Sequence, residues 1–132
     1  MSILVVGGAG YIGAHVVRLL LQRGDEVIVV DDLSYGTPER VAGAALVELD
    51  VASGGAVDTL TDVMGQRGVS AVIHFAARKQ VGESVARPAW YYQQNVGGLA
   101  NMLLAMERAS VGQMIFSSSA AVYGMPPIEV VP

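Results

Sequence analysis

Three glycines, spaced three residues apart, stand between a short apolar run and a segment of helical periodicity. They are Gly7, Gly10 and Gly13, and the apolar run before them is Ile3 to Val6. Glycine permits a sharp turn, lets the backbone approach a pyrophosphate and lets the following helix lie close to a sheet. The free N–H groups and the dipole at the start of that helix favour phosphate. The strand, turn and helix context therefore predicts a dinucleotide-binding turn in preference to a purely structural one.

A carboxylate follows the second apolar run of the chain. Asp31 comes directly after Val27 to Val30, 18 residues beyond Gly13. An acidic side chain at this place can accept hydrogen bonds from the adenosine ribose and would repel a 2′-phosphate. The nearest arginine after the run is Arg40, so the pattern favours NAD over NADP. Asp32 has a plainer alternative as a solvated turn residue.

A second acidic residue ends the third apolar run. Asp50 is followed by Val51, so a carboxylate stands beside an apolar side chain where an adenine ring would rest. The carboxylate could accept a hydrogen bond from the adenine amino group, and the valine could pack against its face. The pair is weak evidence by itself and gains weight from the glycine turn and Asp31.

The composition limits the classes of function. The 132 residues are 52% hydrophobic and 15% charged, as expected for one compact domain and not for a disordered chain. A net charge of −4 with scattered basic residues argues against nucleic acid. Without cysteine there is no disulfide or thiolate metal site, and we predict no metal. With no secretory signal and no apolar stretch of about 20 residues, we expect a cytoplasmic protein with no membrane partner.

Short apolar runs alternate along the chain with segments of helical periodicity. The runs are continuous rather than alternating, which indicates strands buried on both faces of a parallel sheet. Helices between such strands predict an α/β fold with a doubly wound sheet. We predict strands at Ile3–Val6, Val27–Val30, Ala45–Leu49, Ala71–Phe75 and Gln113–Phe116, and helices at Tyr11–Arg23, Ala56–Gln66 and Pro88–Arg108.

Taken together, these features resemble the extended short-chain dehydrogenase/reductase family, and within it the epimerases that invert C4 of UDP-hexoses such as UDP-galactose and UDP-glucose. The likeness covers essentially the whole chain. The segments that carry it are Gly7–Gly13, Asp31, Asp50-Val51, His74–Ser84, Tyr91–Val96 and Phe116–Gly124. The family's fold is Rossmann-like, and we expect about five of its strands here.

The resemblance implies an NAD site and a UDP-sugar substrate. Tyr11 and Ile12 would contact the pyrophosphate through their backbones, and Lys79 would lie near the ribose or the phosphates. The expected cofactor-binding residues are Gly7, Gly10, Tyr11, Ile12, Gly13, Asp31, Asp32, Leu33, Ser34, Tyr35, Gly36, Asp50, Val51, Phe75, Ala76, Ala77, Lys79, Gln94 and Asn95.

The resemblance also implies how the sugar would react. C4 of the sugar gives a hydride to NAD, the 4-keto sugar rotates, and the hydride returns to the other face. Ser119 is the expected catalytic residue, because its hydroxyl can both donate and accept a hydrogen bond beside the C4 oxygen. The family's base is the tyrosine of a Tyr-x-x-x-Lys motif. None of the five tyrosines here has a lysine four positions later.

We therefore expect residues 1–132 to form an incomplete NAD-binding Rossmann domain, without the substrate-binding C-terminal domain. By themselves these residues should be inactive. The complete enzyme should be a homodimer, since family members pair the helix equivalent to Pro88–Arg108 with a second helix that carries the tyrosine.

Other functions remain open. Sugar-nucleotide dehydratases carry an acid pair directly after the active-site hydroxyl residue, where this chain has Ala120 and Ala121. UDP-uronate epimerases or decarboxylases would be distinguished by residues outside this chain. An NAD-binding module without catalysis is a further alternative, and exposed apolar area would count against it. For Glu83 we favour a hydrogen bond that fixes a loop, and for His74 a structural role.

Overall fold

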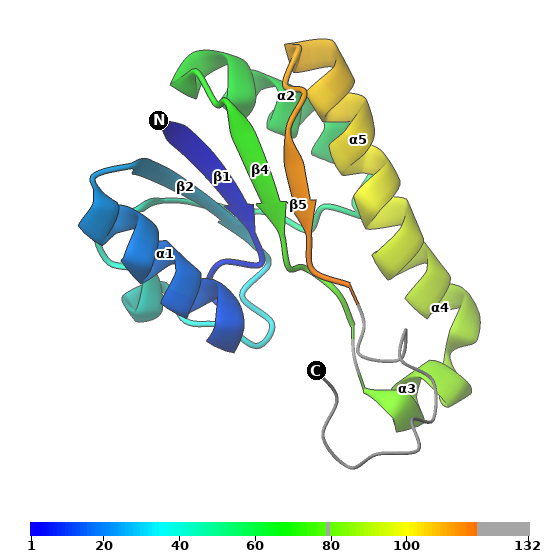
Figure 1. The fold of residues 1–132 in the computed structure, drawn as a ribbon. Coiled ribbons are helices and arrows are strands. Elements are labelled where there is room, and N and C mark those ends of the chain that lie inside the picture. Colours follow the sequence, from blue (N-terminus) through cyan, green and yellow to red (C-terminus); the bar gives the residue numbers. More distant parts are fainter. Residues whose placement is uncertain (79, 119–132) are drawn as a thin grey trace, which may run out of the picture.

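A computed structural model describes residues 1–78 and 80–118 of the chain. Its centre is a sheet of five parallel strands in the order β3-β2-β1-β4-β5, with helices on both faces (Figure 1). The strands are β1 (Ser2–Val6), β2 (Glu26–Asp31), β3 (Ala45–Glu48), β4 (Ala71–His74) and β5 (Met114–Phe116). The helices are α1 (Tyr11–Arg23), α2 (Ala56–Arg67), α3 (Val81–Ala86), α4 (Pro88–Tyr92) and α5 (Gly98–Ala109), with the 3₁₀ turn η1 (Pro38–Val41) and the π-helical turn η2 (Gln93–Gly97).

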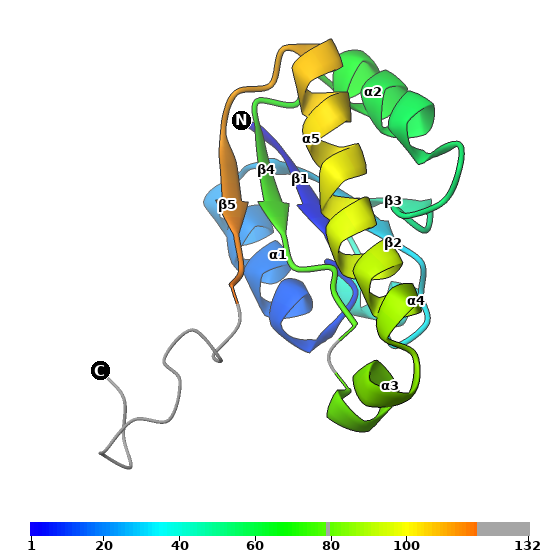
Figure 2. The ribbon, with the colours of Figure 1, turned by 90° about the vertical axis from the view of Figure 1, so that its right-hand side faces the viewer.

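Each central strand contributes apolar side chains to two cores. In β1, Ile3 and Val5 are buried with Val17 of α1 on one face. Leu4 of β1 is buried with Leu60 of α2 on the other. Figure 2 shows α2 and α5 side by side over that second face. Because successive strand residues point to opposite faces, a sheet covered on both sides requires continuous apolar strands. The predicted α/β, Rossmann-like doubly wound sheet is confirmed.

Helix α1 begins and ends at glycines. Gly10 precedes its first residue, and Gly24 follows its last in the left-handed region, with φ of +93°. The N–H of Gly24 donates to carbonyls of the last turn, which glycine allows without strain. The predicted bounds of this helix, Tyr11–Arg23, are therefore confirmed at both ends.

The helix predicted over Pro88–Arg108 differs in its interior. It begins as the short α4, passes through the π-helical turn η2 and continues as α5 to Ala109. A π-helical turn inserts one residue into the helix and is often found at functional sites. Sequence periodicity also did not predict α3 or η1, because both span six residues or fewer and lack a recurring apolar face.

The strand order reverses beside β1. The chain moves outward from β1 through β2 to β3, and then returns to place β4 on the other side of β1. The loops after β1 and β4 therefore leave the sheet in opposite directions and open a crevice at the carboxyl ends of the strands. Ligands of doubly wound sheets bind at this switch point.

Candidate functional site

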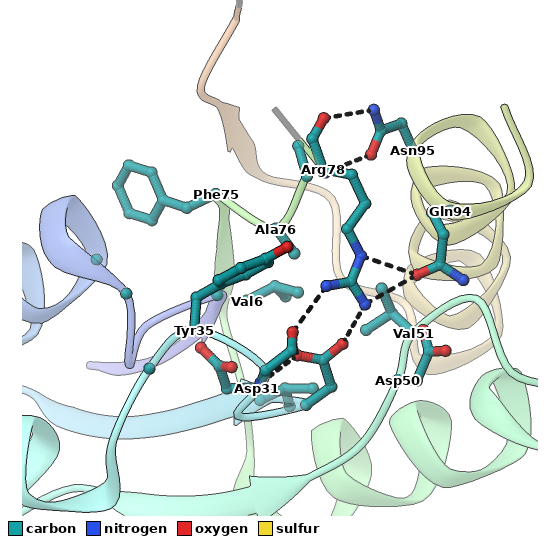
Figure 3. A pocket seen from close by; sticks show the side chains of 18 of the residues that line it. Val6, Asp31, Tyr35, Asp50, Val51, Phe75, Ala76, Arg78, Gln94 and Asn95 are labelled. Carbon is teal, nitrogen blue, oxygen red and sulfur yellow. Dashed lines mark hydrogen bonds and ion pairs between the residues drawn. The ribbon is translucent and has the colours of Figure 1, made fainter. Parts of the chain in front are cut away.

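A cavity of about 310 Å³ lies at this switch point. It brings together segments that are far apart in the sequence: the glycine turn, the loops after β2, β3 and β4, and η2 (Figure 3). Its lining includes Gly7, Gly10, Tyr11, Ile12, Gly13, Asp31, Asp32, Ser34, Tyr35, Gly36, Asp50, Val51, Phe75, Ala76, Ala77, Gln94 and Asn95 from the predicted set, together with Val6, Val30, Leu49, Arg78 and Gln80.

The three glycines of the turn have different steric environments. Gly7 has φ of +79°, and a Cβ there would lie 2.8 Å from the backbone nitrogen of Ala76. A Cβ on Gly13 would lie 2.4 Å from the carbonyl oxygen of Gly7. Both glycines are therefore required by the close packing of loop, helix and sheet. A Cβ on Gly10 would meet only the Gly7 carbonyl oxygen, at 3.4 Å, so this position is open toward the cavity.

The first turn of α1 faces the cavity with N–H donors that no side chain of the described residues caps. The first N–H groups of any helix have no acceptor within it, and Gly10 offers no side chain to cap them. The first turn carries no acidic residue. Tyr11 and Ile12 line the cavity although their side chains are mostly exposed. The helix therefore presents positive potential and N–H donors to an anion.

Asp31 joins the glycine turn to the loop after β2. Its Oδ2 accepts a hydrogen bond from the N–H of Ala9 at 3.0 Å, and its Oδ1 accepts one from the N–H of Leu33 at 2.8 Å. Leu33 has φ of +61°, so the carboxylate holds a residue in an uncommon backbone conformation. Each carboxylate oxygen retains lone pairs for a ribose hydroxyl.

The next loop places an apolar side chain beside a carboxylate. Asp50 accepts a hydrogen bond from the N–H of Ala52 at 2.9 Å, and Val51 is buried. Asn101 of α5 donates to the carbonyl of Val51 at 2.8 Å. Gly98 allows α5 to approach, because a Cβ there would lie 3.0 Å from Val51. Helix α5 thus fixes the adenine side of the predicted site.

Arg78 is the charged residue of the described lining that the predicted set left out. Its guanidinium pairs with Asp32 at 2.7 Å and donates to the hydroxyl of Ser34 at 2.7 Å. Burial raises the pKa of Asp32, but hydrogen bonds from Ser34 and the Arg78 charge outweigh it, so the net pKa lies below its ordinary value. The sequence feature that could have indicated Arg78 is its position as a second cation, next to Lys79 and shortly after the fourth strand.

Five positions of the sequence analysis do not line the described cavity. The side chain of Leu33 does not line the cavity and packs instead against the core on the α1 face. Lys79 and Ser119 lie outside the described residues. So do Ala120 and Ala121, on which the argument against a dehydratase depends.

Tyr91 connects α4 to α3 and to the residue that precedes α3. The Tyr91 hydroxyl donates to Oε1 of Glu83 at 2.8 Å and accepts from the N–H of Gln80 at 3.1 Å. Tyr91 itself is buried. The predicted hydrogen bond of Glu83 is present, but it joins two short helices, α3 and α4, where the sequence suggested a loop.

His74 ends β4 in the core. It is 2% exposed and stacks on Phe116 at 5.8 Å between ring centroids. Among the described residues its Nδ1 has no hydrogen-bond partner. Burial lowers its pKa, and a polar contact with the Ala76 backbone opposes this only in part.

This environment predicts a pH-dependent stability. The unfolded chain binds a proton at His74 near pH 6.5, whereas the folded chain binds it only at lower pH. Stability should therefore decrease as pH falls from 7 to 5. Melting temperatures measured across this range should decline less steeply for His74→Phe than for the wild type. His15→Gln, which alters an exposed histidine of α1, is the control; an unchanged slope in His74→Phe would contradict the assignment.

The described part of the chain offers neither a cluster of metal ligands nor a membrane-spanning helix. No three His, Cys, Asp or Glu side chains gather within reach of one metal ion there. Over the same residues, no helix combines the length and apolar character that a membrane crossing demands.

A family profile and two curated relatives match nearly the whole of this chain. The sequence profile of the NAD dependent epimerase/dehydratase family matches residues 3–131. A UDP-glucose 4-epimerase of Erwinia amylovora is 46% identical over 141 residues, which cover 100% of this chain and 42% of that protein. A UDP-glucose 4-epimerase of Klebsiella pneumoniae is 44% identical, over 96% of this chain and 95% of that protein.

A solved structure shares the fold over almost all of this chain. It is a UDP-glucose 4-epimerase from Stenotrophomonas maltophila with bound NAD and formylated UDP-arabinopyranose, and it superposes with a TM-score of 0.89 and 37% identity over 99% of this chain and 40% of that one. The chain thus spans about two fifths of the length of the Erwinia and Stenotrophomonas proteins. The profile match over nearly all residues, with these identities, places this chain in the NAD-dependent epimerase/dehydratase family.

Proposed function

We propose that the switch-point cavity binds NAD. The observation that carries this proposal is the combination of the glycine turn with Asp31: an open Gly10, free N–H groups at the start of α1, and a carboxylate fixed beside them. A pyrophosphate would bind the helix N-terminus, and the adenosine ribose would hydrogen-bond to Asp31. The residues present fit the cofactor, because Gly10 has no side chain and the described residues leave the space beside it open.

We further propose that the whole protein is a UDP-glucose 4-epimerase. Relatives of that name support this reading. When bound, NAD would supply the hydride acceptor for C4 of the sugar. The protein would orient NAD across the carboxyl ends of the strands through Asp31, the N-terminus of α1 and the Asp50-Val51 pair. Ser119 would hold the proton of the C4 hydroxyl in a hydrogen bond, and the base would be a tyrosine that these 132 residues do not provide.

By this proposal residues 1–132 alone are inactive and the complete protein is a homodimer. Exposed apolar side chains support dimerisation through the α5 helix: Val96 precedes it, and Leu103 and Leu104 lie on it, each about half exposed or more. On β5, Ile115 and Phe116 are 66% and 52% exposed. That exposure argues against the alternative of a free-standing NAD-binding module, since a monomeric module would bury such side chains.

A turnover assay on the natural full-length protein tests the proposal. It should convert UDP-galactose to UDP-glucose, and Ser119→Ala should lower kcat by about 100-fold or more, as loss of a proton-transfer group does. Ser53→Ala, at a turn outside the cavity, should leave turnover unchanged. Turnover of a UDP-uronate but not of UDP-galactose would replace the epimerase assignment with the uronate alternative. Absence of bound NAD would overturn the cofactor assignment.

A further inference from the structure

The side chain of Arg78 crosses the cavity from one wall to the other (Figure 3). On one side it reaches Asp32 and Ser34 in the loop after β2, each at 2.7 Å. On the other it reaches Oε1 of Gln94 in η2, at 3.3 Å from Nη2 and 3.4 Å from Nε. A single side chain thus connects two segments that lie 60 positions apart along the sequence (34 to 94).

The position of this side chain is fixed at both ends. Its backbone N–H donates to Oδ1 of Asn95 at 2.7 Å, and its carbonyl accepts from Nδ2 of the same residue at 3.0 Å. The guanidinium lies 5.8 Å from the Tyr35 ring centroid and 5.2 Å from that of Trp90. Only 14% of the side chain is exposed. All three guanidinium nitrogens donate hydrogen bonds to protein groups. The side chain is therefore held in place by the protein itself.

Arg78 also changes the charge of the cavity. The described lining carries three carboxylates, Asp31, Asp32 and Asp50, and Arg78 is its one cation. Without that cation Asp32 would repel the pyrophosphate of a dinucleotide. An ion pair at the surface contributes little, but this one is mostly shielded from water and adds hydrogen bonds.

We propose that Arg78 is a strap that ties the loop after β2 to η2 across the cavity and slows dissociation of the dinucleotide. The inference rests on the proposed NAD site and extends it to a residue that only this geometry indicates. The cofactor leaves when the bonds from Arg78 to Asp32, Ser34 and Gln94 break together. A tightly held cofactor suits a reaction in which the same NAD accepts and returns one hydride, because loss of NADH between the two transfers would strand the oxidised sugar.

The test is the rate of cofactor release from the natural full-length protein. The protein is loaded with NADH and mixed with excess NAD, and the decay of bound NADH fluorescence gives the rate constant. Arg78→Leu should accelerate release by about tenfold or more, as loss of a shielded charge-assisted contact predicts. Arg87→Leu is the matched control, because Arg87 also stacks on Trp90, at 4.1 Å, but does not line the cavity.

Two further variants locate the effect in the strap. Asp32→Asn should also accelerate release, and the double variant with Arg78→Leu should add little, because both remove one interaction. Arg78→Lys keeps the charge but cannot reach both walls, so its rate should fall between wild type and leucine. It also tests the proposal if the leucine variant fails to fold.

A second readout does not involve the cofactor. In cofactor-free protein, hydrogen exchange of peptides covering residues 31–36 and 93–97 should be faster in Arg78→Lys than in the wild type, with α1 and α2 unchanged. Release and exchange rates that match the wild type in both Arg78 variants would overturn the strap and leave the NAD site intact. A wild-type protein that does not retain NADH would overturn both proposals.

Discussion

Replacing Gly13 with alanine is expected to lower the free energy of unfolding by about 1–3 kcal/mol, the usual cost of overpacking. The added Cβ would lie 2.4 Å from the Gly7 carbonyl oxygen and 2.8 Å from the Gly8 Cα. Both are backbone atoms, so no side chain can rotate away. Relief requires α1 to move from the sheet, which also moves the donors of its first turn. Cofactor affinity should fall together with stability.

Gly10→Ala is the matched variant and should separate the two effects. Its Cβ meets only one atom within 4 Å, at 3.4 Å, and its φ of −75° suits alanine. Stability should change by about 1 kcal/mol at most, the loss at a helix N-cap. NAD affinity should still fall by about 100-fold, because the methyl group occupies the path of the pyrophosphate.

Urea unfolding without cofactor and calorimetric titration with NAD measure these two quantities. Equal destabilisation by the two substitutions would mean that Gly10 and Gly13 do not have separate roles. Unchanged NAD affinity in Gly10→Ala would exclude the turn as the pyrophosphate site.

Asp31→Ala should have the second large effect. It removes the acceptor of two backbone N–H groups, those of Ala9 and Leu33, in a partly buried place. We expect a loss of about 2 kcal/mol in the free energy of unfolding. NAD affinity should fall by roughly 100-fold, which corresponds to about 3 kcal/mol from two charge-assisted hydrogen bonds to the ribose. The preference for NAD over NADP should narrow, because the repelling charge is gone.

Titration with NAD and with NADP, in parallel with urea unfolding, measures the three effects. Asp58→Ala is the control, since that carboxylate is 85% exposed and pairs only with Arg108 at the surface among the described residues. Asp31→Asn keeps one acceptor oxygen and should retain more stability than alanine. A variant that destabilises the fold yet keeps its NAD affinity and cofactor preference would assign Asp31 a structural role alone.

The local sequence determined the fold class and most of its elements. Continuous apolar runs such as Val27–Val30, alternating with segments of helical periodicity, indicated a sheet covered on both faces, because a half-exposed strand would alternate. Gly24 ended α1 because a left-handed residue terminates a helix at little cost only when it lacks a Cβ. The glycine turn and Asp31 were likewise evident, because their roles depend on residue type and on position relative to a strand.

Tertiary structure alone decided the order of the strands, the steric role of each glycine and the place of Arg78. Identical glycines in a motif differ only through the atoms that surround them, as the backbone against Gly13 and the open space at Gly10 show. The sequence presented Arg78 only as a cation next to Lys79 and gave no sign of its contacts. Those contacts follow from the π-helical turn, which places Gln94 and Asn95 opposite the loop of Asp32. A contact between segments so distant in the chain leaves no local pattern, because it arises only when the sheet brings their ends together.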